Sequence, residues 1–256
     1  MLVTIKTRKE IEKIKAANQV IARLYADILP SKIVPGVSTM ELNKIIEEYI
    51  ISCGGVPATI GVGGSNNPYP AGSCISVNEV VVHGIPSDRI LKEGDIVSVD
   101  TVVKLDGYFG DSAMTFPVGE IDEESKLLLE VTKKALEIGI EQCYAGNRLG
   151  DLGNAIDSYV KKNKFTVVRD FCGHGVGYAM HEDPVVMNFG RKGRGIKLEE
   201  GMVIAIEPMV NVGSYKVDIL KDGWTAVTKD RKRSAHFEHS VAIVDGKPMI
   251  LSKLDR

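Results

Sequence analysis

The sequence predicts an α+β fold built from two related halves, about residues 1–118 and 119–256. Two observations lead to this fold class. Segments of the first half recur about 110 residues later, and each half runs through helix-forming stretches before strand-forming ones. No linker rich in Pro, Gly or Ser separates the halves, so we expect a single domain over 1–256 with a shared core.

The internal repeat comprises three pairs of matching segments, in the same order in both halves. One such match could arise by chance, whereas three in one order indicate a duplication. The pairs join residues 36–50 with 146–160, residues 83–86 with 181–184, and residues 91–100 with 198–207.

Four helices are predicted from capping signals and from apolar residues at helical spacing. Thr7 with Glu10, and Ser38 with Glu41, form the capping-box pattern that begins the first two helices. A third helix begins at Asp122, and residues 152–160 lie in the fourth. We expect the apolar stripes of these helices to face the core.

Strand-forming runs rich in β-branched residues follow the helices in each half. Asp106-Gly107 lies between two of these runs, and this dipeptide favours a two-residue hairpin turn. The predicted strands cover residues 75–82, 96–103, 108–116, 203–206, 224–228 and 237–244.

The composition excludes several classes of protein. The chain has 256 residues and is 44% hydrophobic and 26% charged, which excludes a disordered protein. Its net charge of −2 implies no broad basic surface for nucleic acid, and no apolar run is long enough to span a membrane. Four cysteines without a Cys-x-x-Cys pair, and a start without an apolar secretory segment, predict a cytoplasmic protein with free thiols.

Two aspartates are predicted to share one face of the hairpin. With Asp106-Gly107 as the turn, Val102 pairs with Asp111, and Asp100 lies two residues before Val102 on the same face. Either aspartate alone would be typical of a turn or of a strand end. Two carboxylates on one buried face repel each other unless they are protonated or bind a cation, so we expect a divalent metal between them.

The second half supplies further candidate ligands. Glu207 occupies the repeat position of Asp100, after a strand with no other charge. His174 is flanked by Gly173 and Gly175, which allow other groups to approach its imidazole closely.

Glu238 lies between His236 and His239 in a third polar stretch. Strand alternation directs His236 and Glu238 to one face, and the alternative interpretation is a polar-faced edge strand. Four carboxylates with one or two imidazoles suit Mn, Fe, Co or Zn better than Ca. Two shared carboxylates would place two metals about 3.5–4 Å apart, so the residues predict a two-metal hydrolase of unspecified substrate.

The ordered motifs of the chain resemble those of the type I methionine aminopeptidases of bacteria, in metallopeptidase family M24. The resemblance implies the two-halved pita-bread fold, which accounts for the repeat. It also implies removal of the N-terminal (initiator) methionine from nascent proteins and peptides by attack of activated water. The motifs cover residues 78–86, Asp100, Gly110-Asp111, and residues 173–177, 181–184, 206–209 and 238–240.

The resemblance assigns metal ligands to five positions. Asp111 and Glu238 would bridge two divalent metal ions, drawn from Co, Mn, Fe or Zn. Asp100 would complete one metal site, and His174 with Glu207 would complete the other. All five ligand positions of the family are present in order.

Three residues take catalytic roles by the same resemblance. His83 and His181 would contact the substrate and stabilise the tetrahedral intermediate, and Glu207 would take a proton from the attacking water.

The methionine pocket of the family corresponds to Tyr69, Cys74 and Trp224, with His83 and His181 beside it. The sequence departs from the usual pattern of the family at two places near this pocket. A Gly-rich loop over residues 61–68 is longer than in many bacterial members, and Met180 stands where an aromatic residue is common. Since Met is apolar and pliable, the pocket would still accept methionine.

Two other functions remain open from the sequence. A proline-directed peptidase of the same fold usually carries a large amino-terminal domain, for which nothing before Pro35 is a counterpart. A non-catalytic binding protein on this fold would have lost ligands that this chain retains. The expected partner is a nascent polypeptide N-terminus, and the expected state is a monomer. The basic cluster at residues 229–233 is typical of a solvated loop rather than of a transient ribosome contact.

Overall fold

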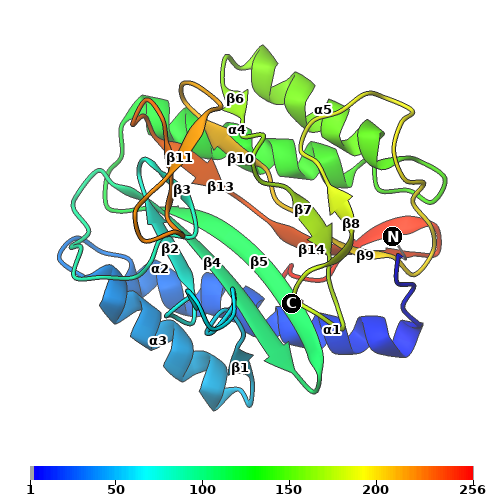
Figure 1. Ribbon diagram of the computed structural model, residues 1–256, viewed down its shortest axis with the longest axis horizontal. Helices are drawn as coiled ribbons and strands as arrows, with labels where there is room; N and C mark the ends of the chain where they lie inside the picture. Colours follow the sequence, from blue (N-terminus) through cyan, green and yellow to red (C-terminus); the bar gives the residue numbers. More distant parts are fainter. Residues whose placement is uncertain (1–2, 256) are drawn as a thin grey trace.

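The computed structural model describes residues 3–255 and confirms the α+β architecture (Figure 1). The blue helices of the first half lie along one side of the molecule, the green helices of the second half lie along the other, and the strands run between them. Of the described residues, no helix combines the length and the apolar character needed to cross a membrane.

The first half carries most of its helices before its strands. These elements are α1 (Arg8–Arg23), a π-helical segment η1 (Leu24–Ile28), α2 (Leu29–Lys32), α3 (Thr39–Ser52), β1 (Val56–Pro57), β2 (Cys74–Val77), β3 (Val80–Val82), β4 (Ile96–Leu105) and β5 (Tyr108–Pro117).

The second half repeats this order with more and shorter strands. Its elements are α4 (Glu123–Ile140), α5 (Leu149–Lys162), β6 (Thr166–Val167), β7 (Gly173–Gly175), β8 (Glu182–Val186), β9 (Val203–Ile206), β10 (Met209–Asn211), β11 (Val217–Ile219), β12 (Ala226–Thr228), β13 (Ser234–His236), β14 (His239–Val244) and β15 (Lys247–Ile250).

Side-chain caps set the starts of three helices where the sequence predicts them. The Thr7 and Ser38 hydroxyls accept hydrogen bonds from the N–H groups of Glu10 and Glu41, whose carboxylates accept in return from the cap residues. Asp122 accepts from the backbone N–H of Ser125 at 2.8 Å. Each cap satisfies a donor that the first helical turn leaves without a partner.

The hairpin of β4 and β5 has the predicted register. Its turn residues Asp106 and Gly107 have φ of 48° and 85°, as a two-residue turn between twisted strands requires. Val102 lies opposite Asp111, so Asp100 and Asp111 project from the same face of the sheet. β4 is also paired with β1 and β2, which makes it a central strand of this sheet.

The same backbone contacts recur at matching positions of the repeat. Ser38 before α3 bridges to Ile90, and Arg148 before α5 bridges to Lys197. The paired hydrogen bonds are Gly36 N to Leu91 O and Leu91 N to Val37 O in the first half, and Gly146 N to Leu198 O and Leu198 N to Asn147 O in the second.

Two predicted strands are interrupted. Residues 75–82 form two strands because Asn78 adopts a φ of 54°, with its side chain hydrogen bonded to Asp95 and to the N–H of Ile96. β3 thereby leaves the sheet of β2 and pairs with β12 of the second half. The predicted strand at 237–244 begins only at His239, because the N–H of Glu238 donates to Ala113 O on β5.

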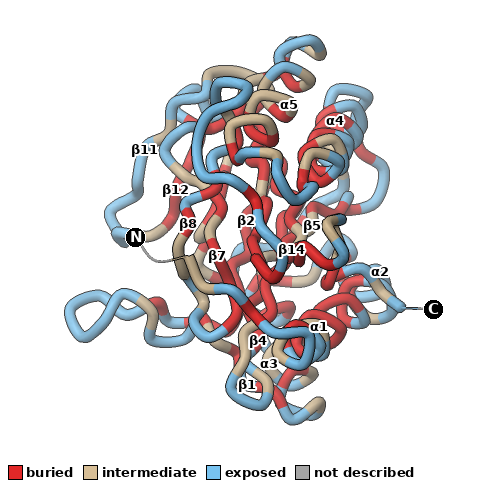
Figure 2. Tube along the Cα trace, turned by 90° about the vertical axis from the view of Figure 1, so that its right-hand side faces the viewer, coloured by how far each residue is buried: buried red, intermediate tan, exposed pale blue. Residues whose placement is uncertain are grey.

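Two hydrophobic clusters make up most of the core. One lies under α1 and α3 and includes Ile21, Leu42 and Val97, and the other lies under α4 and α5 and includes Leu128 and Ile204. The central strands are accordingly buried along most of their length, whereas the outer helices expose one face (Figure 2). Met114 on β5 packs against both clusters, so the two halves share a boundary.

Gly110 allows α1 to lie directly on β5. A Cβ at this position would be 2.6 Å from the backbone N of Asn18 and 2.7 Å from the backbone C of Ala17. We expect Gly110→Ala to reduce the free energy of unfolding by about 1–3 kcal/mol, because α1 must move away from the sheet. Urea unfolding followed by circular dichroism measures the change.

The matched control is Gly107→Asn in the turn of the same hairpin. Asn tolerates the positive φ that this turn position requires, so the control should stay within about 1 kcal/mol of the wild type. Equal stability of Gly110→Ala and the wild type would show that the contact between α1 and β5 is not close-packed.

Candidate metal centre

All five predicted ligands line a single cavity of about 600 Å³. Asp100 and Asp111 come from β4 and β5, and His174 comes from the short strand β7. Glu207 follows β9, and Glu238 lies between β13 and β14. The cavity is thus formed by residues of both halves.

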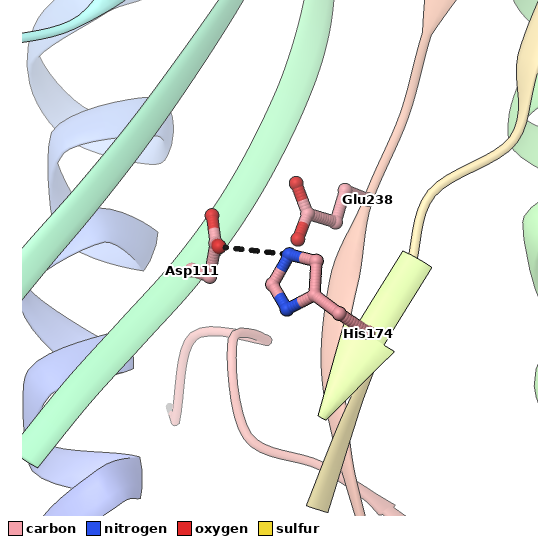
Figure 3. A group of neighbouring side chains, drawn as sticks. All are labelled: Asp111, His174 and Glu238. Carbon is pink, nitrogen blue, oxygen red and sulfur yellow. Dashed lines mark ion pairs between the residues drawn. The ribbon is translucent and has the colours of Figure 1, made fainter. Parts of the chain in front are cut away.

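Asp111, His174 and Glu238 form the tightest group. Each of them offers one donor atom within 4.8 Å of the others, and their side chains converge on one point (Figure 3). His174 Nε2 lies 3.6 Å from Asp111 Oδ2, the pair joined by the dashed line in Figure 3, and 3.4 Å from Glu207 Oε1.

Backbone hydrogen bonds fix the strands that carry Asp111 and Glu238. The Ser240 hydroxyl donates to Asp111 O at 2.7 Å, and the Ser112 hydroxyl donates to Glu238 O at 2.8 Å. The N–H of Asp111 donates to Asn18 Oδ1 on α1 at 3.2 Å. These bonds use main-chain atoms, so they leave the carboxylate oxygens directed into the cavity.

The glycines on either side of His174 are required by close backbone packing. A Cβ on Gly173 would lie 2.2 Å from Ala205 O, and a Cβ on Gly175 would lie 2.2 Å from Asp183 O. His174 therefore sits on a strand held between β9 and β8, which the sequence analysis did not predict. The glycines serve close approach of neighbouring backbone, whereas the sequence suggested the approach of other groups to the imidazole.

Burial raises the pKa of every carboxyl group in the centre. It raises the pKa of Asp100 to about 7, and it raises the pKa of Asp111, Glu207 and Glu238 well above the ordinary carboxyl range. The charges of the neighbouring carboxylates raise these last three further. Burial therefore favours the protonated form of these acids unless a cation balances their charge.

The same burial keeps the imidazoles neutral. Desolvation, with the nearby His181, lowers the pKa of His174 to about 4. Desolvation likewise lowers the pKa of His83 to about 4 and that of His236 to about 3. Neutral His174 presents a nitrogen lone pair near pH 7, which is the form that binds metal ions.

Two buried polar atoms in the centre have no hydrogen-bond partner among the described residues. They are Glu238 Oε1 and His236 Nε2, and His236 Nε2 lies 3.8 Å from Glu207 Oε2. Buried polar atoms are normally paired, so a buried carboxylate oxygen without a partner among acids is suited to binding a cation. Oxygen and imidazole donors of this kind fit a divalent transition metal.

The residues predicted to bind substrate line the same cavity. Tyr69, Cys74, His83, Met180, His181 and Trp224 all contribute to its wall. The Tyr69 and Trp224 rings meet edge to face with centroids 5.3 Å apart. The Gly-rich loop packs on this wall, because Trp224 Nε1 donates to Asn67 O and a Cβ on Gly63 would lie 2.5 Å from the Trp224 ring.

His236 is the residue of the centre that the sequence reasoning did not select. Its side chain is 2% exposed, and it faces Glu207. The available signal was its place two residues before Glu238, but that spacing suits an edge strand equally well. The cavity wall also includes Asp170, Phe171 and Cys172, which no motif marked.

The fold and the acid-imidazole centre define a metal-dependent hydrolase, and the comparison with protein families identifies its class. The model of metallopeptidase family M24 matches residues 12–245, so the chain belongs to this family. Its architecture is the pita-bread fold of that family.

Individual relatives give a finer comparison. A methionine aminopeptidase of Clostridium perfringens is 49% identical over 98% of this chain and 99% of that protein. Methionine aminopeptidase 1 of Bacillus subtilis is 44% identical over 99% of this chain and 100% of that protein. The crystal structure of the methionine aminopeptidase from Rickettsia prowazekii superposes with a TM-score of 0.95, at 40% identity over 98% of this chain and 100% of that one.

Metal binding should release protons and should weaken as the pH falls. The carboxyl groups hold protons well above their ordinary pKa, up to about pH 7 for Asp100, and a bound cation must displace them. We expect the affinity for Mn²⁺ to fall about ten-fold per pH unit, for each proton displaced, between pH 7 and pH 5. His174, with a pKa of about 4, stays neutral through this range and does not contribute.

Isothermal titration calorimetry in two buffers of different ionisation enthalpy counts the protons released. The titration is carried out on metal-free protein at pH 5, 6 and 7. An affinity that is the same at pH 5 and pH 7 would show that the buried acids are already ionised without metal.

Proposed function

We propose that this chain removes methionine from the N-terminus of peptides and nascent proteins by metal-dependent hydrolysis. The observation that carries the proposal is the union of two features in one cavity. The cavity is lined by the acid-imidazole centre and also by an apolar wall that includes Tyr69, Cys74 and Trp224. Relatives of 44% and 49% identity over nearly the whole chain carry the name methionine aminopeptidase, which supports this substrate.

The five residues Asp100, Asp111, His174, Glu207 and Glu238 would together hold two divalent ions. When bound, such ions supply Lewis-acid chemistry, polarising the scissile carbonyl and acidifying a water molecule. The donor set suits Co, Mn, Fe or Zn.

Glu207 is the proposed general base of the reaction. Its carboxylate would take the proton from the attacking water and pass it to the leaving amine. The backbone carbonyl of Glu207 accepts a hydrogen bond from Asn188 Nδ2 at 3.0 Å, which helps fix the start of this side chain.

His83 and His181 are the proposed donors to the oxyanion that develops on the scissile carbonyl. Desolvation and its neighbour His181 lower the pKa of His83, and desolvation lowers the pKa of His181. Each ring is therefore a neutral N–H donor near pH 7. Phe171 and Trp224 hold the His83 ring edge to face, at centroid distances of 5.3 and 6.2 Å.

The apolar wall would accept the methionine side chain. Tyr69 is fixed there because its hydroxyl donates to Gly84 O at 2.9 Å. Met180 adds a pliable apolar side chain to the same wall, so the pocket can follow the flexible thioether of the substrate.

We extend the proposal to the setting of the reaction. Residues 1–256 would act as a single catalytic domain, and the resemblance to the family favours a monomer. The protein would work in the cytoplasm on nascent chains. A transient ribosome contact would use the basic cluster at 229–233, most of which is exposed.

A peptide panel tests the substrate directly. We expect the Mn²⁺-loaded protein to release Met from Met-Ala-Ser and to leave an X-Pro dipeptide intact, because the apolar wall suits the methionine side chain. Chromatography of the products measures both reactions. The second peptide is needed because a prolidase of Pyrococcus furiosus shares the fold, with a TM-score of 0.77 at 22% identity. Cleavage of the X-Pro dipeptide without release of Met would contradict the proposal.

The proposed role of Asp111 as a metal ligand can be tested with an isosteric change. Asp111→Asn removes the charge and keeps the shape, and we expect it to lower kcat by at least about a hundred-fold and to weaken Mn²⁺ binding. Asp106→Asn, in the turn of the same hairpin, is the control and should retain both properties. A wild-type rate for Asp111→Asn would exclude the proposed role of this carboxylate.

A further inference from the structure

Lys6 lies before α1 and buries its ammonium group against the residue that follows His181. Its side chain is 1% exposed, and Lys6 Nζ lies 2.6 Å from Glu182 Oε2, whose side chain is 9% exposed. The ammonium also donates to Thr4 O at 3.3 Å and lies 5.6 Å from the centroid of the Tyr178 ring. The ion pair joins the amino-terminal segment to the start of β8. Removing one partner of a buried ion pair is costly, because the other charge is left buried without a partner.

The second oxygen of Glu182 closes the loop that precedes it. Glu182 Oε1 accepts hydrogen bonds from the backbone N–H groups of Tyr178 and of Ala179, the latter at 3.0 Å. The loop from Gly177 to His181 is therefore folded around one carboxylate. Because Lys6 holds the other oxygen of that carboxylate, its position sets the position of the loop.

Two glycines allow the amino-terminal segment to come this close. The N–H of Lys6 donates to Gly201 O at 2.8 Å, and a Cβ on Gly201 would lie 2.7 Å from Lys6 O. A Cβ on Gly177 would lie 2.8 Å from Lys6 Cε. The Tyr178 hydroxyl adds a second link, since it donates to Glu10 Oε1 on α1 at 2.7 Å.

His181 itself has little packing to hold it. The residue is exposed, and its ring meets His174 edge to face with centroids 4.4 Å apart. The place of its imidazole in the cavity therefore depends on the backbone of the loop that Glu182 closes.

We infer that Lys6, through its ion pair with Glu182, is a positioning residue for His181 in the reaction. The inference rests on the proposed function, in which His181 donates to the developing oxyanion. Among the described residues, the polar partners of the Lys6 ammonium are Glu182 and Thr4, and neither is a proposed metal ligand. Its effect on the reaction would therefore pass through the loop from Gly177 to His181. A hydrogen-bond donor that is displaced by a small distance loses much of its stabilisation of the transition state. Loss of the ion pair should therefore lower kcat more than it raises KM.

A double-mutant cycle on the Mn²⁺-loaded protein with Met-Ala-Ser tests the inference. We expect Lys6→Met to lower kcat about ten-fold to a hundred-fold, with KM and Mn²⁺ affinity within about two-fold of the wild type. In the His181→Ala background the same substitution should cost less than about two-fold, because the residue that Lys6 positions is absent.

The matched control is Lys15→Met, which breaks the more exposed ion pair between Lys15 and Asp255 at 2.9 Å. We expect it to leave kcat unchanged in both backgrounds. If Lys6→Met does not fold, as judged by circular dichroism, the cycle uses Glu182→Gln. That variant keeps an oxygen acceptor for the loop and removes the charge that holds Lys6.

The outcomes separate the inference from the function on which it rests. An equal loss of kcat in both backgrounds, or no loss with His181 present, would overturn the positioning role while the peptidase activity stands. If the wild-type protein releases no methionine, the proposed function is overturned and the inference with it.

Discussion

Four carboxyl groups share one buried space at the centre of this fold, and the rest of the structure is organised around that constraint. Asp100, Asp111, Glu207 and Glu238 each lose hydration there, and their mutual repulsion adds to the cost. Such a group persists only with protons or a cation to balance it. The hydrogen bonds that hold its backbone therefore come from neutral donors such as Ser112 and Ser240, which bind main-chain carbonyls and leave the carboxylates free.

Neither half of the duplicated fold holds the centre alone. The first half contributes two aspartates from one hairpin, whereas the second contributes His174, Glu207 and Glu238 from separate segments. Contacts at the helix starts are the same in both halves, where Ser38 and Arg148 make equivalent bridges. The duplication thus preserved the outer architecture while the inner residues took different roles, and packing the two halves together brings the ligands within reach of one another.

Local interactions explain which parts of the structure the sequence predicts well. The register that places Asp100 beside Asp111 follows from the turn at Asp106-Gly107. The starts of the first two helices follow from capping boxes, which join each N-cap residue to the residue three positions later. Strand alternation is a poor guide to the position of Glu238, because residues 237 and 238 are not part of the strand predicted over 237–244. The N–H of Glu238 instead donates to Ala113 O on β5, which is distant in the sequence. For the same reason His236 was missed, and nothing near Lys6 in the sequence indicates its partner Glu182.

Desolvation acts on the acids and on the imidazoles of this centre in opposite senses, yet it drives both towards neutrality. It raises the carboxyl pKa values, so the acids hold protons that a cation must displace, and it lowers the pKa of His174 to about 4, so this ring is ready to bind without losing a proton. The proton cost of metal binding therefore falls on the carboxylates alone. Desolvation also lowers the pKa of His83 and of His181, so these rings stay neutral donors beside the metal ligands. One physical effect, the desolvation of the groups that line the cavity, thus prepares both the ligands and the donors that the proposed reaction requires.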